Sequence, residues 1–227
     1  MGRKKISEFT AISSPEVSAV VPLTNNGNTR KITPTNLATK IKSILGIPDS
    51  FDYASNEQII YEFLPIEWAQ DGTAPPDAAE SLATGDGSVQ IRKFAGDSTQ
   101  DVIFPWIVPN DIKISDKIKF QVLCVITEAT PPSNEGVNFD LSGYCIGDGV
   151  CIGGILGTDV GSSKTGMSDT QYDFIITTLS AEVTITDLAA GELAMLHLKR
   201  DHDDTDDTYA QSIGVIGIRI QMTREVA

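Results

Sequence analysis

The alternation of hydrophobic and polar residues along this chain is typical of β-strands over most of its length. The clearest pattern lies at 189–222, where two apolar stretches flank the acidic segment 201–207. Apolar runs on either side of a short hydrophilic segment predict two antiparallel strands joined as a β-hairpin, with the acidic segment as its solvated tip. Such a hairpin suggests that most of the chain builds a sandwich of β-sheets.

Shorter apolar runs predict further strands before this hairpin. The strongest of them is 118–126, and the others are 59–64, 89–94, 102–108, 137–145, 172–178 and 182–186. Turn residues separate these runs, and the chain has no fixed-period repeat of the kind that a solenoid or propeller needs. Eight to ten strands predict a mainly β fold, an antiparallel β-sandwich of jelly-roll type over residues 59–227.

The first 46 residues predict an extended arm that contains one short α-helix. Thr33 suits the N-cap, Pro34 suits the first helical position, and Gly46 suits the C-terminal end. The predicted apolar face consists of Leu37, Ile41 and Ile44. A helix of about 12 residues is marginal by itself in water, so we expect it to pack against the body, a second copy or another particle. Residues 47–58 are predicted to be a linker.

Charge is divided unevenly between the arm and the rest of the chain. The whole chain has a net charge of −14. Residues 1–46 hold seven basic and two acidic residues, which is +5, and residues 47–227 therefore carry −19. An acidic body disfavours nucleic acid and anionic membrane as partners. No apolar run reaches the roughly 20 residues of a membrane span, and the basic start lacks the apolar stretch of a Sec-type export signal.

The three cysteines and the acidic segment predict no metal site. Cys124, Cys145 and Cys151 have no partners at zinc-ligand spacing. Cys145 and Cys151 either pair or remain buried thiols, and the second alternative is favoured. The acidic segment 201–207 lacks the glycine and the distal glutamate of an EF-hand loop.

Catalysis has little support in the sequence. His197 and His202 are the two histidines, and no Gly-x-Ser-x-Gly motif accompanies them. Lys164 is wrongly spaced from the preceding glycines for a phosphate-binding loop. Trp68 and Trp106 suit either a sugar-stacking surface or packing within or between subunits, and packing is favoured. We therefore predict no enzyme activity, no catalytic residue and no cofactor.

Two N-terminal stretches resemble the virion-anchoring segment of tailed-bacteriophage fibre and spike proteins. Residues 5–14 read KISEFTAISS, and residues 20–37 read VVPLTNNGNTRKITPTNL. In those segments a K-I-S-x-L motif precedes an apolar strand, an N-G-x-T-x-K-I-T motif and a short helix. Phe9 stands where leucine is usual.

The remainder is similar to a β-sandwich module of phage structural proteins. The motifs are FPWIVP at 104–109, AGEL at 190–193, and Arg200-Asp201 followed by DDTDDTY at 203–209. The resemblance implies homotrimers that are anchored to the head or tail by the arm, with the β domain outward. We therefore expect a structural protein of the virion exterior, made in the host cytoplasm, of the short head-fibre, decoration or tail-attached kind.

The arm is the expected contact with other virion proteins. Apolar anchors and flanking cations together form the predicted site: Lys4, Lys5, Ile6, Phe9, Ile12, Arg30, Lys31, Leu37 and Ile41. The apolar members would enter pockets of the partner, and the cations would add salt-sensitive attraction. The alternative function is a receptor- or glycan-binding module for host adsorption, with a host surface glycan as its partner.

Overall fold

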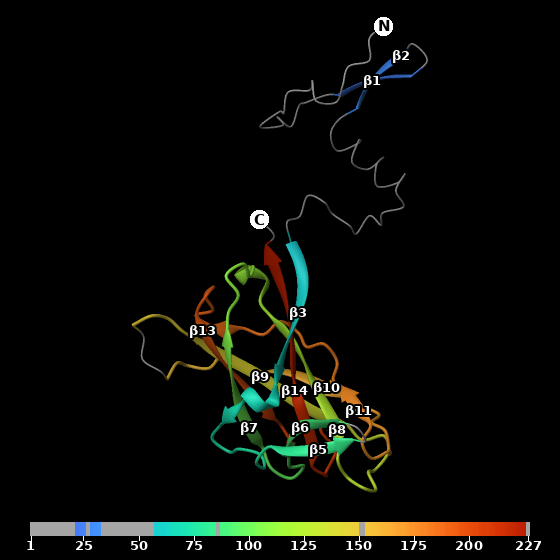
Figure 1. Ribbon diagram of the computed structural model, residues 1–227, viewed down its shortest axis with the longest axis vertical. Helices are drawn as coiled ribbons and strands as arrows, with labels where there is room; N and C mark the ends of the chain where they lie inside the picture. The colour runs from blue at the N-terminus through green and yellow to red at the C-terminus, as the bar shows by residue number, and fades with distance from the viewer. Residues whose placement is uncertain (1–20, 26–27, 33–56, 85–86, 150–152, 226–227) are drawn as a thin grey trace. The chain divides into compact units, whose positions relative to one another are not determined.

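The computed structural model describes residues 21–25, 28–32, 57–84, 87–149 and 153–225 (Figure 1). The chain divides into two compact units, Met1–Ser55 and Asn56–Ala227. In the first unit, β1 (Val21–Asn25) pairs antiparallel with β2 (Asn28–Ile32), in keeping with the turn signal of the Asn-Gly pair between them. Arg30 and Lys31 lie in β2. The predicted helix and the other predicted anchors (Lys4, Lys5, Ile6, Phe9, Ile12, Leu37 and Ile41) lie outside the described residues.

The second unit contains two antiparallel β-sheets, named here after their central strands. The β14 sheet has the order β11-β8-β14-β6-β5, and β3 also pairs with β14. Its strands are β3 (Glu57–Pro65), β5 (Glu80–Thr84), β6 (Gly87–Phe94), β8 (Lys119–Ile126), β11 (Phe174–Ile176) and β14 (Ile213–Glu225). Figure 1 shows β3 and β14 side by side, with the start of β3 next to the end of β14.

The β13 sheet has the order β10-β9-β13-β7-β4, with β12 added in parallel to β9. Its strands are β4 (Gln70–Asp71), β7 (Gln100–Ile107), β9 (Val137–Ile146), β10 (Val160–Lys164), β12 (Ile185–Thr186) and β13 (Leu193–Arg200). The predicted mainly β fold with antiparallel sheets is thus confirmed. The described helices are two short 3-10 turns, η2 (Ile66–Trp68) and η3 (Ile114–Asp116), and neither is long enough to cross a membrane.

The core forms from the facing sides of the two sheets. Burial alternates along β13, where Ala194, Leu196 and Leu198 turn inward. Large apolar side chains from both sheets are fully buried with them, among them Phe94, Phe104, Phe120, Phe139 and Ile220. Burying each such side chain stabilises the fold by roughly 1.5–3 kcal/mol. Cys124 and Cys145 are buried free thiols, and Cys151 lies outside the described residues.

The predicted C-terminal hairpin is wrong, because β13 and β14 belong to different sheets. Arg200 ends β13 fully buried, and its Nε and Nη2 donate to Asp207 at 2.8 Å each. The guanidinium also donates to the carbonyls of Phe94, Tyr209 and Gln211. These contacts draw the chain away from β13 and across to the other sheet, so the acidic segment is not entirely solvated.

Candidate functional site

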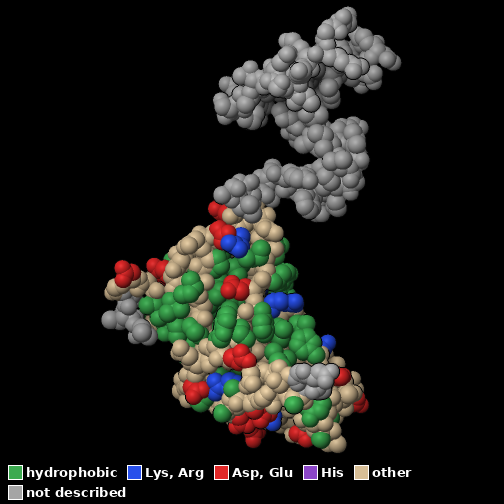
Figure 2. Space-filling view, in the orientation of Figure 1, with side chains coloured by type: hydrophobic (Ala, Val, Ile, Leu, Met, Phe, Trp, Pro, Cys, Tyr) green, Lys and Arg blue, Asp and Glu red, His purple; other side chains and the backbone are tan. Residues whose placement is uncertain are grey.

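Exposed aromatic rings lie on the outer face of the β14 sheet. Along β3, Leu64 turns toward the core, whereas Ile59, Tyr61 and Phe63 turn outward. Tyr61 is 57% exposed and Phe63 is 44% exposed. In the view of Figure 2, hydrophobic side chains cover much of the middle of this unit, with charged side chains among them. Apolar groups gathered on a surface in this way are typical of binding sites.

A row of polar side chains lies beside these rings. On β14, Arg219 is opposite Phe63, and Gln221 is opposite Tyr61. On β8, the next strand, Gln121 is opposite Arg219. Residues paired in register place their side chains on the same face of a sheet. The outer face therefore combines aromatic carbon with guanidinium and amide groups.

Arg219 is held in place by its neighbours. Its Nε donates to Gln121 Oε1 at 3.2 Å, and its Nη2 donates to the same oxygen. Gln121 Nε2 in turn donates to the Thr177 carbonyl at 2.8 Å. The guanidinium carbon lies 5.2 Å from the centre of the Tyr61 ring, which is within the range of a cation–π contact. Ring and cation are thus arranged before any ligand binds.

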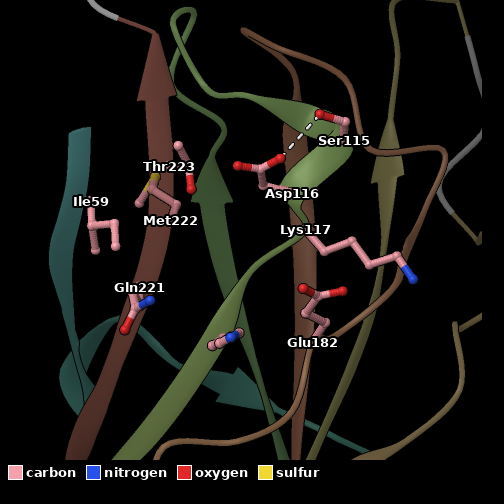
Figure 3. A pocket seen from close by; sticks show the side chains of 9 residues that line it. Ile59, Ser115, Asp116, Lys117, Glu182, Gln221, Met222 and Thr223 are labelled. Carbon is pink, nitrogen blue, oxygen red and sulfur yellow. Dashed lines mark hydrogen bonds between the residues drawn. The ribbon is translucent and has the colours of Figure 1, made fainter. Parts of the chain in front are cut away.

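An open pocket of about 280 Å³ lies at one end of this face (Figure 3). It is lined by Ile59, Ser115, Asp116, Lys117, Lys119, Glu182, Gln221, Met222 and Thr223. Figure 3 shows Ile59 on one side with the β14 residues, and Lys117 and Glu182 on the other. The Lys113 amide donates to the Thr223 carbonyl at 2.8 Å, which fixes the η3 turn at the end of β14.

Lys113 binds one carboxylate in the pocket lining, that of Asp116, and a second carboxylate outside it, that of Glu57. Lys113 Nζ lies 2.7 Å from Glu57 and 2.9 Å from Asp116. Hydrogen bonding by Lys113 holds the pKa of Asp116 below its usual value, and the bonds to Glu57 and Asp116 raise the pKa of Lys113. Within the described part of the chain, no carboxylate lies within ion-pair distance of Lys117 or Lys119. The pocket thus holds two lysines that an anion can approach.

A second open pocket of about 240 Å³ lies at the other end of the face. It is lined by Phe63, Pro65, Glu67, Ser88, Val89, Gln90 and Ile216. The outer side of β3 from Ile59 to Pro65, with Arg219, Gln221 and the two pockets, is called the β3 strip below. Six residue steps along a strand span about 20 Å, the length of a short oligomeric ligand.

Among the described residues, the histidines and the acidic segment form no cluster that could hold a metal ion. His197 Nε2 lies 2.7 Å from Asp101 Oδ2, and Asp101 also accepts hydrogen bonds from the amides of Thr73 and Ala74. His202 instead lies 2.9 Å from the Thr99 hydroxyl. Asp101 and His197 therefore hold a loop in place.

Lys199 forms ion pairs with three carboxylates, one of which, Asp201, belongs to the acidic segment. Its Nζ lies 3.0 Å from Asp159, 3.3 Å from Asp140 and 3.5 Å from Asp201. Burial alone would lower the pKa of Lys199, yet Asp159 and Asp140 hold it above its usual value. The ammonium group of Lys199 thus already balances part of the negative charge of Asp140, Asp159 and Asp201.

The sequence did not identify the aromatic residues of the β3 strip. Packing within or between subunits was favoured for Trp106, and this side chain is 2% exposed and donates from Nε1 to Glu62 Oε2 at 3.0 Å within this unit. Tyr61 and Phe63 lie in a strand that has apolar residues on both of its faces. The alternation of apolar and polar residues therefore did not show which side chains turn outward. The acidic residue between the two rings, Glu62, would even have predicted the opposite orientation, because it lies on the inward side with Leu64 and accepts a hydrogen bond from Trp106.

No protein-family model matches this chain, and no curated protein matches it. Among solved structures it is similar to a family 11 carbohydrate-binding module from Clostridium thermocellum in complex with a β-1,3-1,4-mixed-linked tetrasaccharide. The identity is 14%, the TM-score is 0.34, and the match covers 76% of this chain and 92% of that one. A TM-score of this size assigns neither a family nor a ligand to this protein.

Two further solved structures are similar at the same level. The CBM22-2 xylan-binding domain from Paenibacillus barcinonensis is 8% identical with a TM-score of 0.35, over 77% of this chain and 95% of that one. A Shewanella oneidensis MR-1 protein of unknown function is 12% identical with a TM-score of 0.30, and the match covers 86% of this chain and 96% of that one.

Proposed function

We propose that the β-sandwich binds carbohydrate along the β3 strip. The observation that carries this proposal is the pair of exposed rings, Tyr61 and Phe63, beside the fixed guanidinium of Arg219. A sugar ring presents an apolar C–H face and a rim of hydroxyl groups. Flat aromatic carbon suits the first, and prearranged hydrogen-bond donors suit the second.

The prearrangement of the strip favours this function over non-specific adhesion. Both rings project from a strand that pairs with β14 over nine residues, from Glu57 to Pro65. Arg219 is already bonded to Gln121. Groups that are fixed before binding lose little conformational entropy when a ligand arrives. The absence of enzyme activity stays a prediction.

The experiment uses the full chain, a glycan array and calorimetry with the best glycan found. Tyr61→Ala and Phe63→Ala should each weaken binding at least tenfold, which is about 1.4 kcal/mol. Tyr172→Ala is the matched control, because Tyr172 is 51% exposed but lies in the loop before β11, outside the strip. Unchanged affinity in the Tyr61 and Phe63 variants, or no glycan bound at all, would contradict the proposal.

We further propose that the first unit attaches this module to a bacteriophage particle for host adsorption. Two observations support it: the resemblance of residues 5–14 and 20–37 to virion-anchoring segments, and the β1–β2 hairpin, which carries Arg30 and Lys31 within a separate compact unit. The particle would carry the protein on its exterior as a homotrimer.

Deletion of residues 1–33 tests the attachment. Virions should then lack the protein, while the truncated chain still folds and gives the trimer mass in light scattering. Truncated protein that co-purifies with particles at full occupancy would place the anchor elsewhere, and a monomeric full chain at micromolar concentration would exclude the trimer.

A further inference from the structure

The charged side chains of the β3 strip indicate which glycans it would bind most tightly. This inference rests on the proposed function. Three cations lie along the strip or its end pocket: Lys117, Lys119 and Arg219. They belong to the part of the chain that carries a net charge of −19. Cations gathered on one face of an acidic body attract anionic ligands to that face.

Two acidic groups around the pocket are bound to a further lysine and not to these cations. Asp116 and Glu57 are both bound to Lys113, so this lysine offsets one of their two negative charges. Glu182 also lines the pocket, at the position next to Val183, which pairs with Ile118. Among the described residues, Lys117, Lys119 and Arg219 have no carboxylate within ion-pair distance, and neither Glu182 in this pocket nor Glu67 in the second pocket has a cation partner.

The backbone at Lys117 adds an independent observation. Its φ is 53° and its ψ is −177°, a positive-φ conformation that favours glycine over every other residue. Strained positions of this kind gather at binding sites and catalytic sites. A lysine in place of the glycine that this turn would favour indicates that its side chain is used, and Figure 3 shows that side chain extending past Glu182, away from Ile59 and Met222.

We propose that the β3 strip selects glycans whose sugars carry anionic groups. The sugar rings would lie on Tyr61 and Phe63, and an anionic substituent would enter the pocket beside Lys117 and Lys119. A lysine ammonium is a compact point charge that suits either a carboxylate or a sulfate. The shared requirement is thus a negative charge at one end of a short oligosaccharide.

The test measures binding of the full chain to an oligogalacturonate and to the same oligosaccharide after its carboxyl groups are reduced to alcohols. A sulfated galactan and its desulfated form provide the second pair. The charged member of at least one pair should bind at least tenfold more tightly, and its affinity should fall as salt rises. The pair that shows the difference identifies the anionic group.

Variants separate the role of the lysines from folding. Lys117→Gly relieves the backbone conformation, so it should keep the unfolding midpoint and still lose about fivefold or more in affinity for the charged oligosaccharide. Lys119→Gln should show a similar loss. Lys164→Gln, on β10 of the other sheet, is the matched control.

The outcomes distinguish this inference from the proposed function. Equal affinity for the charged and uncharged members, with loss in Tyr61→Ala, would overturn anionic selection and leave carbohydrate binding intact. Binding of neither member of either pair, alongside tight binding to a neutral glycan, would also overturn it. Unchanged affinity of both Lys117→Gly and Lys119→Gln for the charged oligosaccharide would show that the two lysines do not contact the ligand.

Discussion

Arg200 is the residue on which the connection between the two sheets depends. Five hydrogen bonds satisfy its guanidinium, two to Asp207 and three to backbone carbonyls, and both side chains of the pair are almost fully buried. A buried charge is tolerated when it is paired and hydrogen-bonded, and removal of one partner leaves the other unpaired in the interior.

Asp207→Ala should therefore lower the free energy of unfolding by about 3–5 kcal/mol. Urea denaturation of the full chain measures this loss. Asp203→Asn is the control, because Asp203 is exposed in the same segment and should change the stability by less than about 0.5 kcal/mol. Similar small losses in both variants would show that the ion pair does not hold the connection.

Asp101 makes the stability depend on pH. Burial would raise the pKa of its carboxyl, but hydrogen bonds from Ala74, His197 and Thr73 outweigh burial and hold the pKa below its ordinary value near 3.9. A depressed pKa in the folded state contributes stability above the unfolded pKa, and that contribution is lost as pH falls through the folded value.

Asp101→Asn should cost about 1–3 kcal/mol at pH 7, because it removes a charged acceptor from three donors. It should also reduce the loss of stability on acidification below about pH 4, which unfolding curves at a series of pH values measure. Asp169→Asn, at an exposed position, should change neither quantity. Parallel pH profiles for wild type and Asp101→Asn would contradict this role.

At the scale of elements, the β3 strip exists because β14 changes partners along its length. Its first residues pair with β6, and from Gly217 onward it pairs with β3 on that side. The pairing with β8 shifts register between Val215 and Gly217. Glycine at such a point allows a close approach of backbone and side chains.

Gly217→Ala should displace β3 and weaken carbohydrate binding. A Cβ at this position would lie 2.4 Å from the Leu64 carbonyl oxygen and 2.7 Å from Phe63 Cε2. We expect a loss of about 1–3 kcal/mol in stability and a measurable loss of glycan affinity.

Gly161→Ala is the matched control on β10, where the nearest contacts are side-chain atoms at 3.2 Å or more. It should retain the glycan affinity of the wild type. Wild-type stability and affinity in Gly217→Ala would show that β3 tolerates displacement at this point.

At the scale of the whole molecule, the division at residue 56 predicts that the second unit folds without the first. A chain of residues 56–227 contains both sheets and the entire described core. It should melt cooperatively with a β-type circular dichroism spectrum.

A shorter chain that starts at residue 66 provides the comparison. It lacks β3, whose inward-facing Leu64 is buried in the core, and should melt at a lower temperature and lose carbohydrate binding. An unfolded 56–227 chain would show that the arm is part of the domain.

The sequence by itself determined the mainly β class and the approximate place of most strands. The predicted strand at 118–126 corresponds to β8, and 137–145 corresponds to nearly all of β9. Period-two alternation is a local property, so it can be read from neighbouring residues alone. The arm, its helix and its anchors stay predictions that come from the sequence.

Only the tertiary structure decided which strands pair and which rings reach the surface. The strands before and after 201–207 suggested a hairpin, yet the buried Arg200–Asp207 pair sends them into different sheets. Trp106 lies inside, whereas Tyr61 and Phe63 lie outside, although all three stand in apolar strands. Strand pairing joins residues far apart in the chain, and the exposed side of a strand with two apolar faces depends on what packs against it.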